Sequence, residues 1–386
     1  MNDSYFDDIR SYRDEEVPAA IARILSSKKL EPLLSPFLGS QEVTQLMETL
    51  PEIKTIYDFQ FNIIKKLLDG VLNRAGAQLY SRNIDIFDTS KGCLFVSNHR
   101  DIVLDPTFLG YLFLDKGILT AEVAIGNNLL IEPWIEDIVK LNRSFIVKRD
   151  VQGRELLLSS QKISAYIRHV IAVKHANVWI AQREGRAKDG NDATQSSLLK
   201  MLHFSAESKS LIDGFDELRI VPVSISYEFD PCDVLKAKEL YLHSVGIDFQ
   251  KSPYDDLLSM KWGLLGLRGR VCYSFSREIN NKEIRDYKDN QTFVDSLAAM
   301  IDQRIYASYE LFPSHFYCFD KFHSLKRFDH KYSEDDGVLF EKILDNKIKL
   351  LLPEFIDNQD FRQHVYLQYA NVLKNALTVN PMLIRK

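Results

Sequence analysis

The feature that most constrains the fold is an alternation, between residues 83 and 276, of short apolar runs with longer helical stretches. Short runs rich in β-branched and aromatic residues, bounded by turn residues, favour buried strands. The predicted strands are 83–87, 92–97, 123–126, 144–147, 176–180, 219–226 and 269–276, and the predicted helices between them are 106–113, 129–139, 154–175 and 196–207. This alternation predicts an α/β fold with a mixed, mostly parallel sheet flanked by helices.

Helical patterns flank this central part on both sides. Residues 1–80 are predicted as an N-terminal helical region, 81–285 as the α/β domain and 286–386 as a C-terminal helical extension. Within the extension we expect a helix that begins near Phe293 and ends at Pro313, followed by helices over 338–352 and 360–377.

Composition excludes several classes of function. The net charge of -5 and the pI near 6.0 give no reason to expect a nucleic-acid partner. The four cysteines are far apart and form no CxxC pair, so we expect neither a metal site nor disulfides, and a reducing compartment. The polar start of the chain does not resemble a signal peptide, and the longest apolar runs are too short to span a bilayer. The expected location is the cytoplasm, peripheral on the inner face of the membrane.

The stretch 97–106, Ser-Asn-His-Arg-Asp-Ile-Val-Leu-Asp-Pro, follows an apolar run directly. His99 comes at the end of the predicted strand, and Asp105 is expected to cap the helix that Pro106 begins. An imidazole whose one nitrogen is held by a carboxylate can take a proton from a hydroxyl with the other. Asp101 and Asp105 are both candidates for that carboxylate.

Three later stretches carry further candidates. In 142–150, Arg149 follows an apolar strand that contains Phe145, and such a cation can bind a phosphate or carboxylate. In 178–190, a buried strand opens into a turn with Glu184, Gly185 and Arg186, where glycine permits close approach of a ligand to the backbone. The stretch 220–227 is an apolar strand with Pro222 inside it and is expected to form a wall.

These four stretches, in this order and spacing, resemble the four blocks of the glycerolipid acyltransferases, the family of glycerol-3-phosphate and 1-acylglycerol-phosphate acyltransferases and tafazzin. The resemblance covers about half the chain, from Asn83 to Glu278. It implies that His99 is the general base and that an aspartate orients it. It also implies that Arg149 and Arg186 bind an anionic head group, that Phe145, Glu184 and Gly185 belong to the same substrate site, and that Pro222 lines the pocket.

The chain departs from the family's pattern at three places. The family's aspartate position, five residues after the histidine, is Leu104 here, so Asp105 implies a one-residue insertion and Asp101 competes with it. Phe145 comes one residue earlier than the family's aromatic residue, and the third block is one residue short before Arg186.

The resulting hypothesis is an O-acyltransferase that moves a fatty acyl group from acyl carrier protein or coenzyme A to the hydroxyl of a glycerol phosphate or lysolipid. It requires no cofactor and no metal ion. The alternatives are O-acylation of a lyso-aminolipid and a non-catalytic lipid- or acyl-carrier-binding scaffold, which Leu104 at the aspartate position would suit. Trp134 and the basic, apolar stretch 261–270 are expected to face lipid or to pack on the sheet.

Overall fold

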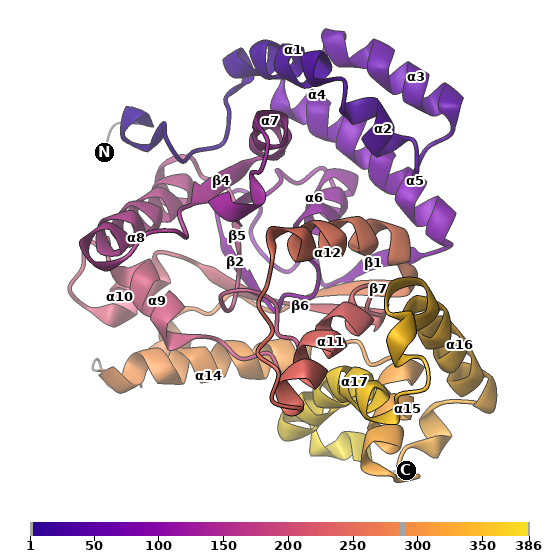
Figure 1. Ribbon diagram of the computed structural model, residues 1–386. Coiled ribbons are helices and arrows are strands. Elements are labelled where there is room, and N and C mark those ends of the chain that lie inside the picture. The colour runs from indigo at the N-terminus through magenta and orange to yellow at the C-terminus, as the bar shows by residue number, and fades with distance from the viewer. Residues whose placement is uncertain (1–2, 286, 288–290, 385–386) are drawn as a thin grey trace.

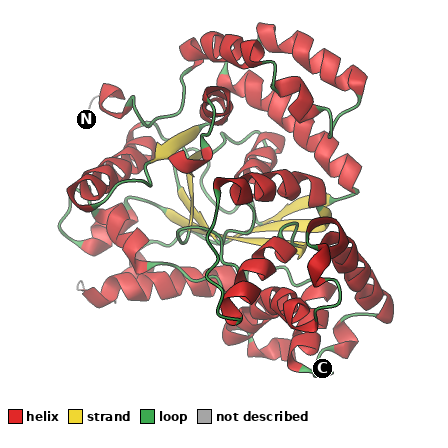
Figure 2. Cartoon of the chain, in the orientation of Figure 1, coloured by secondary structure: helices red, strands yellow, loops and turns green. Residues whose placement is uncertain are grey.

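The computed structural model describes residues 3–285, 287 and 291–384, and it confirms the predicted α/β class (Figures 1 and 2). Seven strands form one sheet in the order β1-β7-β6-β2-β5-β3-β4. Strands β6 and β7 pair antiparallel and the other neighbours pair parallel. The strands are Gln78–Arg82 (β1), Leu94–Ser97 (β2), Glu122–Gly126 (β3), Ser144–Val147 (β4), Val178–Ala181 (β5), Ile220–Phe229 (β6) and Arg268–Phe275 (β7).

One face of the sheet packs against the N-terminal helices and two helices of the central part. A single apolar cluster joins Val17 in α1 to Phe95 in β2 and Phe275 in β7, so the N-terminal helices share a core with the sheet. These elements arch over the sheet at the top of Figure 1. They are α1 (Val17–Ser27), α2 (Leu30–Leu34), α3 (Ser40–Thr49), α4 (Ile56–Phe59), α5 (Lys65–Ala75), α6 (Leu104–Asp115) and α7 (Pro133–Leu141).

The opposite face is covered by helices from the middle and the later part of the chain. Phe145 in β4, Ile180 in β5 and Phe293 in α14 belong to one apolar cluster on this face. The covering helices are α8 (Gly153–Arg168), α9 (Ser196–His203), α10 (Leu211–Asp216), α13 (Asn281–Ile284) and α14 (Gln291–Ala307). The sheet is therefore the middle of three layers, as short strands buried on both faces require.

The remaining helices gather beside the long strand β6. They are α11 (Asp233–Ser244), α12 (Pro253–Gly266), α15 (Pro313–His323), α16 (Glu334–Leu351) and α17 (Gln359–Val379). A third apolar cluster joins Phe229 at the end of β6 to α11, α15, α16 and α17. In Figure 1 these four helices lie together at the lower right, and α12 lies across the front of the sheet, where it contacts α5.

The predicted strand 83–87 is wrong. Ile84 and Phe87 are buried in the core, but they lie in a turn, and the strand is the preceding segment Gln78–Arg82. Burial produces the same apolar pattern in a turn as in a strand, and β1 at the sheet edge alternates only weakly.

The expected end of a helix at Pro313 is also wrong. The earlier helix ends at Ala307, and Pro313 is the first residue of α15, a position where the missing N–H costs nothing. The predicted domain limits at residues 1, 286 and 386 lie outside the described residues.

Two further observations concern membrane-spanning helices and the cysteines. The described part of the chain contains no helix that is both long and apolar enough to cross a membrane. Cys93, Cys232, Cys272 and Cys318 are buried free thiols.

Candidate active site

Several of the residues singled out from the sequence meet at one edge of the sheet. Strands β2, β5, β3 and β4 are neighbours and run parallel, so their carboxyl ends lie at the same edge. Ser97 at the end of β2 pairs with Ala181 at the end of β5, which places the turn of His99 beside the turn that contains Glu184. Val147 at the end of β4 pairs with Gly126 of β3, which brings in Arg149.

The turn after β2 folds around the carboxylate of Asp105. Oδ2 of Asp105 lies 2.8 Å from Nδ1 of His99 and accepts hydrogen bonds from the backbone N–H groups of Arg100 (2.6 Å) and Asp101 (2.9 Å). Oδ1 accepts a hydrogen bond from the hydroxyl of Tyr227 (2.8 Å). A carboxylate can accept all four donors, and the contact to Nδ1 leaves Nε2 of His99 as the nitrogen that can accept a proton.

Asp101 has a different role from the one considered for it. Its Oδ1 accepts hydrogen bonds from the N–H groups of Val103 and Leu104 at the start of α6, and its Oδ2 lies 3.5 Å from Sγ of Cys232. Burial and the nearby Asp105 raise the pKa of Asp101. Asp101 thus accepts hydrogen bonds from backbone N–H groups at the start of α6. The expectation that Asp105 caps this helix is wrong, because α6 already begins at Leu104.

His99 is half-buried, and its ring packs edge-on against Trp179 of β5 at 5.7 Å between centroids. The indole of Trp179 donates a hydrogen bond to Oγ of Ser97. Both amide atoms of the Asn98 side chain pair with the backbone of Ile225 in β6, as another strand residue would. The turn that carries His99 is therefore fixed to the strands on both sides.

Arg149 and Glu184 form an ion pair at this edge. Nη1 of Arg149 lies 2.6 Å from Oε1 of Glu184, and its backbone N–H donates to Oδ1 of Asn127. The Arg149 side chain lies so close to Gly126 that a Cβ there would overlap Nε. The Glu184 side chain is 74% exposed, so this ion pair faces solvent at the rim of the site.

Arg186 lies deeper than Arg149. Gly185 before it has φ of +68°, the left-handed conformation that glycine adopts without strain, and the chain turns inward there. Arg186 is buried, and one of its guanidinium nitrogens, Nη1, has no hydrogen-bond partner. Burial and the charge of Arg186 lower the pKa of Lys188. A buried cation with an unpaired N–H group is suited to bind an anion.

Phe145 and Pro222 point away from His99. Along β5, β3 and β4 the register pairs Trp179 with Val123 and Val123 with Ser144, so Phe145 faces the other side of the sheet. Phe145 is fully buried and packs edge-on against Tyr166 in the core. Pro222 pairs with Val96, whose side chain also faces that second side. The structure therefore does not bring these two residues to the edge where His99 lies.

Sequence reasoning missed several residues that shape the site. Tyr227 contacts Asp105 through its hydroxyl, and Tyr273 of β7 donates a hydrogen bond to the Asp105 backbone oxygen (2.8 Å). Burial raises the pKa of both tyrosines, so both hydroxyls stay protonated and can donate. A tyrosine at the end of the mostly apolar stretch 220–227 is a signal that could have indicated Tyr227.

Comparisons with known proteins add a fold-level observation. No protein-family model matches the chain, and no curated protein matches it. Among solved structures, the fold is similar to that of the 1-acyl-sn-glycerophosphate (LPA) acyltransferase PlsC from Thermotoga maritima. The TM-score is 0.40 at 8% sequence identity, over 74% of this chain and 94% of that chain. A likeness at this level does not identify a function.

The described residues contain no group of three His, Cys, Asp or Glu side chains arranged to hold a metal ion.

Proposed function

We propose that the protein is an O-acyltransferase that moves a fatty acyl group from an acyl carrier protein or coenzyme A thioester to the hydroxyl of a glycerol phosphate or lysolipid. The observation that carries this proposal is the contact between His99 and Asp105 at an edge of the sheet that also holds Arg149 and Arg186. The contact supplies a base, and the two cations supply a place for an anionic acceptor.

In the proposed reaction, Nε2 of His99 takes the proton of the acceptor hydroxyl as the oxygen attacks the thioester carbonyl. Asp105 holds the ring and stabilises the imidazolium that forms. The tetrahedral intermediate then collapses, the carbon–sulfur bond breaks, and the proton on His99 passes to the leaving thiolate. The products are an ester and a free thiol, so no oxidant, reductant or cofactor is needed.

The contact between His99 and Asp105 also weighs against the non-catalytic scaffold. That alternative rests on Leu104 at the family's aspartate position, but a one-residue insertion still brings a carboxylate to the imidazole. The lyso-aminolipid alternative keeps some support, because the exposed pair of Arg149 and Glu184 offers both charges to a zwitterionic head group.

The test is thiol release from an acyl thioester by the purified protein, with glycerol 3-phosphate, a lysophosphatidate or a lyso-aminolipid as acceptor. We expect acceptor-dependent release that falls by at least about a hundredfold in His99→Ala. His330→Ala, a partly exposed histidine in the C-terminal helices, is the matched control and should keep the parent rate. Release that is the same in His99→Ala and the parent would contradict the proposal.

We propose further that the protein meets an anionic membrane surface with exposed leucines next to this edge. Trp134 is half-buried and donates its indole N–H to Glu132, and Trp262 is also half-buried, so neither ring is fully exposed to a lipid surface. By contrast, Leu156, Leu157 and Leu158 at the start of α8 are 47–54% exposed. Residues 148–155, which connect β4 to these leucines, carry three cations and two acids, so a lipid surface there would lie close to the acceptor site.

A further inference from the structure

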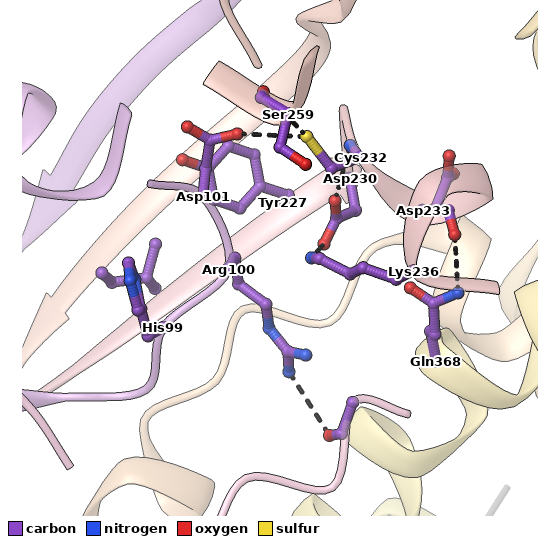
Figure 3. Close-up of polar contacts among 12 residues, drawn as sticks. His99, Arg100, Asp101, Tyr227, Asp230, Cys232, Asp233, Lys236, Ser259 and Gln368 are labelled. Atoms are coloured by element: carbon purple, nitrogen blue, oxygen red, sulfur yellow. Dashed lines mark hydrogen bonds and ion pairs between the residues drawn. The ribbon is translucent and has the colours of Figure 1, made fainter. Parts of the chain in front are cut away.

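Arg100 connects the turn of His99 to a second loop. Its backbone N–H binds the same Asp105 oxygen that holds His99, and its side chain leaves the turn in another direction. In Figure 3, His99, Arg100 and Asp101 point three ways from one stretch of backbone. The guanidinium Nη2 lies 2.6 Å from Oδ2 of Asp192 and 3.4 Å from the backbone oxygen of Gly190.

The loop that Arg100 reaches is the one that carries the third block. It begins after β5 with Glu184 and Arg186 and ends near Thr194, whose N–H and hydroxyl both donate to Asp302 of α14. Both ends of the Arg100 contact are thus fixed: one is the turn of His99, and the other is the loop of the anion-binding residues.

The same loop rests on the C-terminal helices. Gly190 has φ of +73° and packs so closely on α17 that a Cβ would overlap the backbone oxygen of Gln368. Asn371 of α17 donates a hydrogen bond to the backbone oxygen of Asp189 (2.9 Å), and Tyr306 of α14 donates one to the backbone oxygen of Asp192. The C-terminal helices therefore hold the loop from outside the site.

Asp192 is the counter-ion of Arg100, and two other acidic groups nearby are paired with lysines. Asp230 is paired with Lys236 at 2.5 Å, and Lys347 lies 2.9 Å from both carboxylate oxygens of Asp233. Burial and the charge of Arg100 lower the pKa of the adjacent His315 to about 3, so this ring stays neutral.

The geometry points to Arg100 as a positioning residue, which sets His99 relative to the loop of Glu184 and Arg186 through the buried Asp192. This inference rests on the proposed function. In this inference Arg100 acts through other residues and does not bind the acceptor, so its loss should leave the acceptor bound by Arg149 and Arg186 while the base is misplaced. Displacements of about 1 Å in an active site cost on the order of a hundredfold in rate.

The deciding variant is the double substitution Arg100→Met with Asp192→Asn, which removes both charges together and leaves neither buried without a partner. We expect kcat to fall by roughly 10- to 100-fold, with the dissociation constant of the acceptor within about threefold of the parent. The control is an ion pair between α17 and α16 in which Arg362 is buried and Asp345 is 41% exposed: Arg362→Met with Asp345→Asn should leave kcat unchanged. A parent-like kcat in the first variant, or an equal loss in the control, overturns the inference.

Two further measurements keep the test decisive. Arg100→Lys keeps a charge beside Asp192, so a folded variant should retain more of the parent kcat than the double variant does, and an equal loss in both would also overturn the inference. Hydrogen exchange of residues 97–105 and 184–192 needs no activity: both segments should exchange faster in the double variant and not in the control pair. If the parent protein shows no acyl transfer, the proposed function fails, while hydrogen exchange still decides whether Arg100 ties the two segments.

Discussion

Replacing Asp105 with asparagine separates the orientation of His99 from the charge beside it. Oδ2 of Asp105 accepts two backbone N–H groups, so the amide oxygen of an asparagine must take that place, because an amide nitrogen would face two donors. That oxygen still accepts from Nδ1 of His99, and the amide NH₂ faces Tyr227, whose hydroxyl can turn to accept. The variant therefore keeps the ring in place and loses the negative charge.

The cost follows from the change in one hydrogen bond. A hydrogen bond to a charged group contributes about 1.5–3 kcal/mol and one between neutral groups about 0.5–1.5 kcal/mol. Because the imidazolium of His99 forms only during the proposed reaction, a difference of about 1–2 kcal/mol raises the barrier and lowers kcat by roughly 5- to 30-fold. The assay is the initial rate of thiol release at saturating concentrations of both substrates.

Two companion variants make the result interpretable. Asp101→Asn keeps an oxygen for the N–H groups of Val103 and Leu104, so its kcat should stay within about twofold of the parent. Asp105→Ala should in addition unfold at lower urea, since two backbone N–H groups lose their acceptor at about 1–3 kcal/mol each. A parent-like kcat in Asp105→Asn, or an equal loss in Asp101→Asn, would refute the assignment of Asp105 as the partner of His99.

Three further predictions concern other parts of the molecule. Burial raises the pKa of Asp302 from 3.8 to about 6, so its contribution to stability is complete below about pH 4 and is lost as the pH rises through 6. Asp302→Asn should therefore gain up to about 3 kcal/mol relative to the parent between pH 4 and pH 7 in urea denaturation, and a constant difference would contradict this. Gly190→Ala should cost about 1–3 kcal/mol more than Gly185→Ala, because both residues have positive φ but only Gly190 meets a neighbouring backbone; equal midpoints in urea would be the contrary result. Leu157→Glu should reduce sedimentation with anionic vesicles by at least about fivefold, whereas Leu339→Glu, equally exposed on α16, should not, and equal sedimentation of both would count against the leucine surface.

The sheet and its flanking helices were predictable because strand burial on both faces leaves uninterrupted apolar runs. Six of the seven strands lie at the predicted places to within a few residues. The exception, β1, lies at the sheet edge, where one neighbour and partial exposure leave little apolar signal, while Ile84 and Phe87 fill the core from a turn. Hydrophobicity reports burial, and it does not report backbone conformation.

The candidate site was predictable in part. The grouping of His99, Arg149 and Glu184 follows from strands that end at one edge. The choice between Asp101 and Asp105 depends on which way each side chain leaves a tight turn, which spacing alone does not give. Phe145 faces the side of the sheet opposite to Trp179. Side chains alternate between the two faces along a strand, and the face that Phe145 occupies follows only from the register of β4 with β3. The contact between Arg100 and Asp192 joins residues 92 positions apart, and no local pattern indicates it.

The pairing of β1 with β7 has a consequence for synthesis of the chain. Gln78 in β1 pairs with Arg270 in β7, so β1 has no partner strand until β7 has been synthesised, 192 residues later. At about 5–20 residues per second, the ribosome needs on the order of 10–40 s to supply that partner. Until then the apolar side of the N-terminal helices, which packs on Val271, Tyr273 and Phe275 in the finished fold, is only partly covered. The nascent chain therefore depends on late closure of its sheet, and we expect it to need protection from aggregation for that interval.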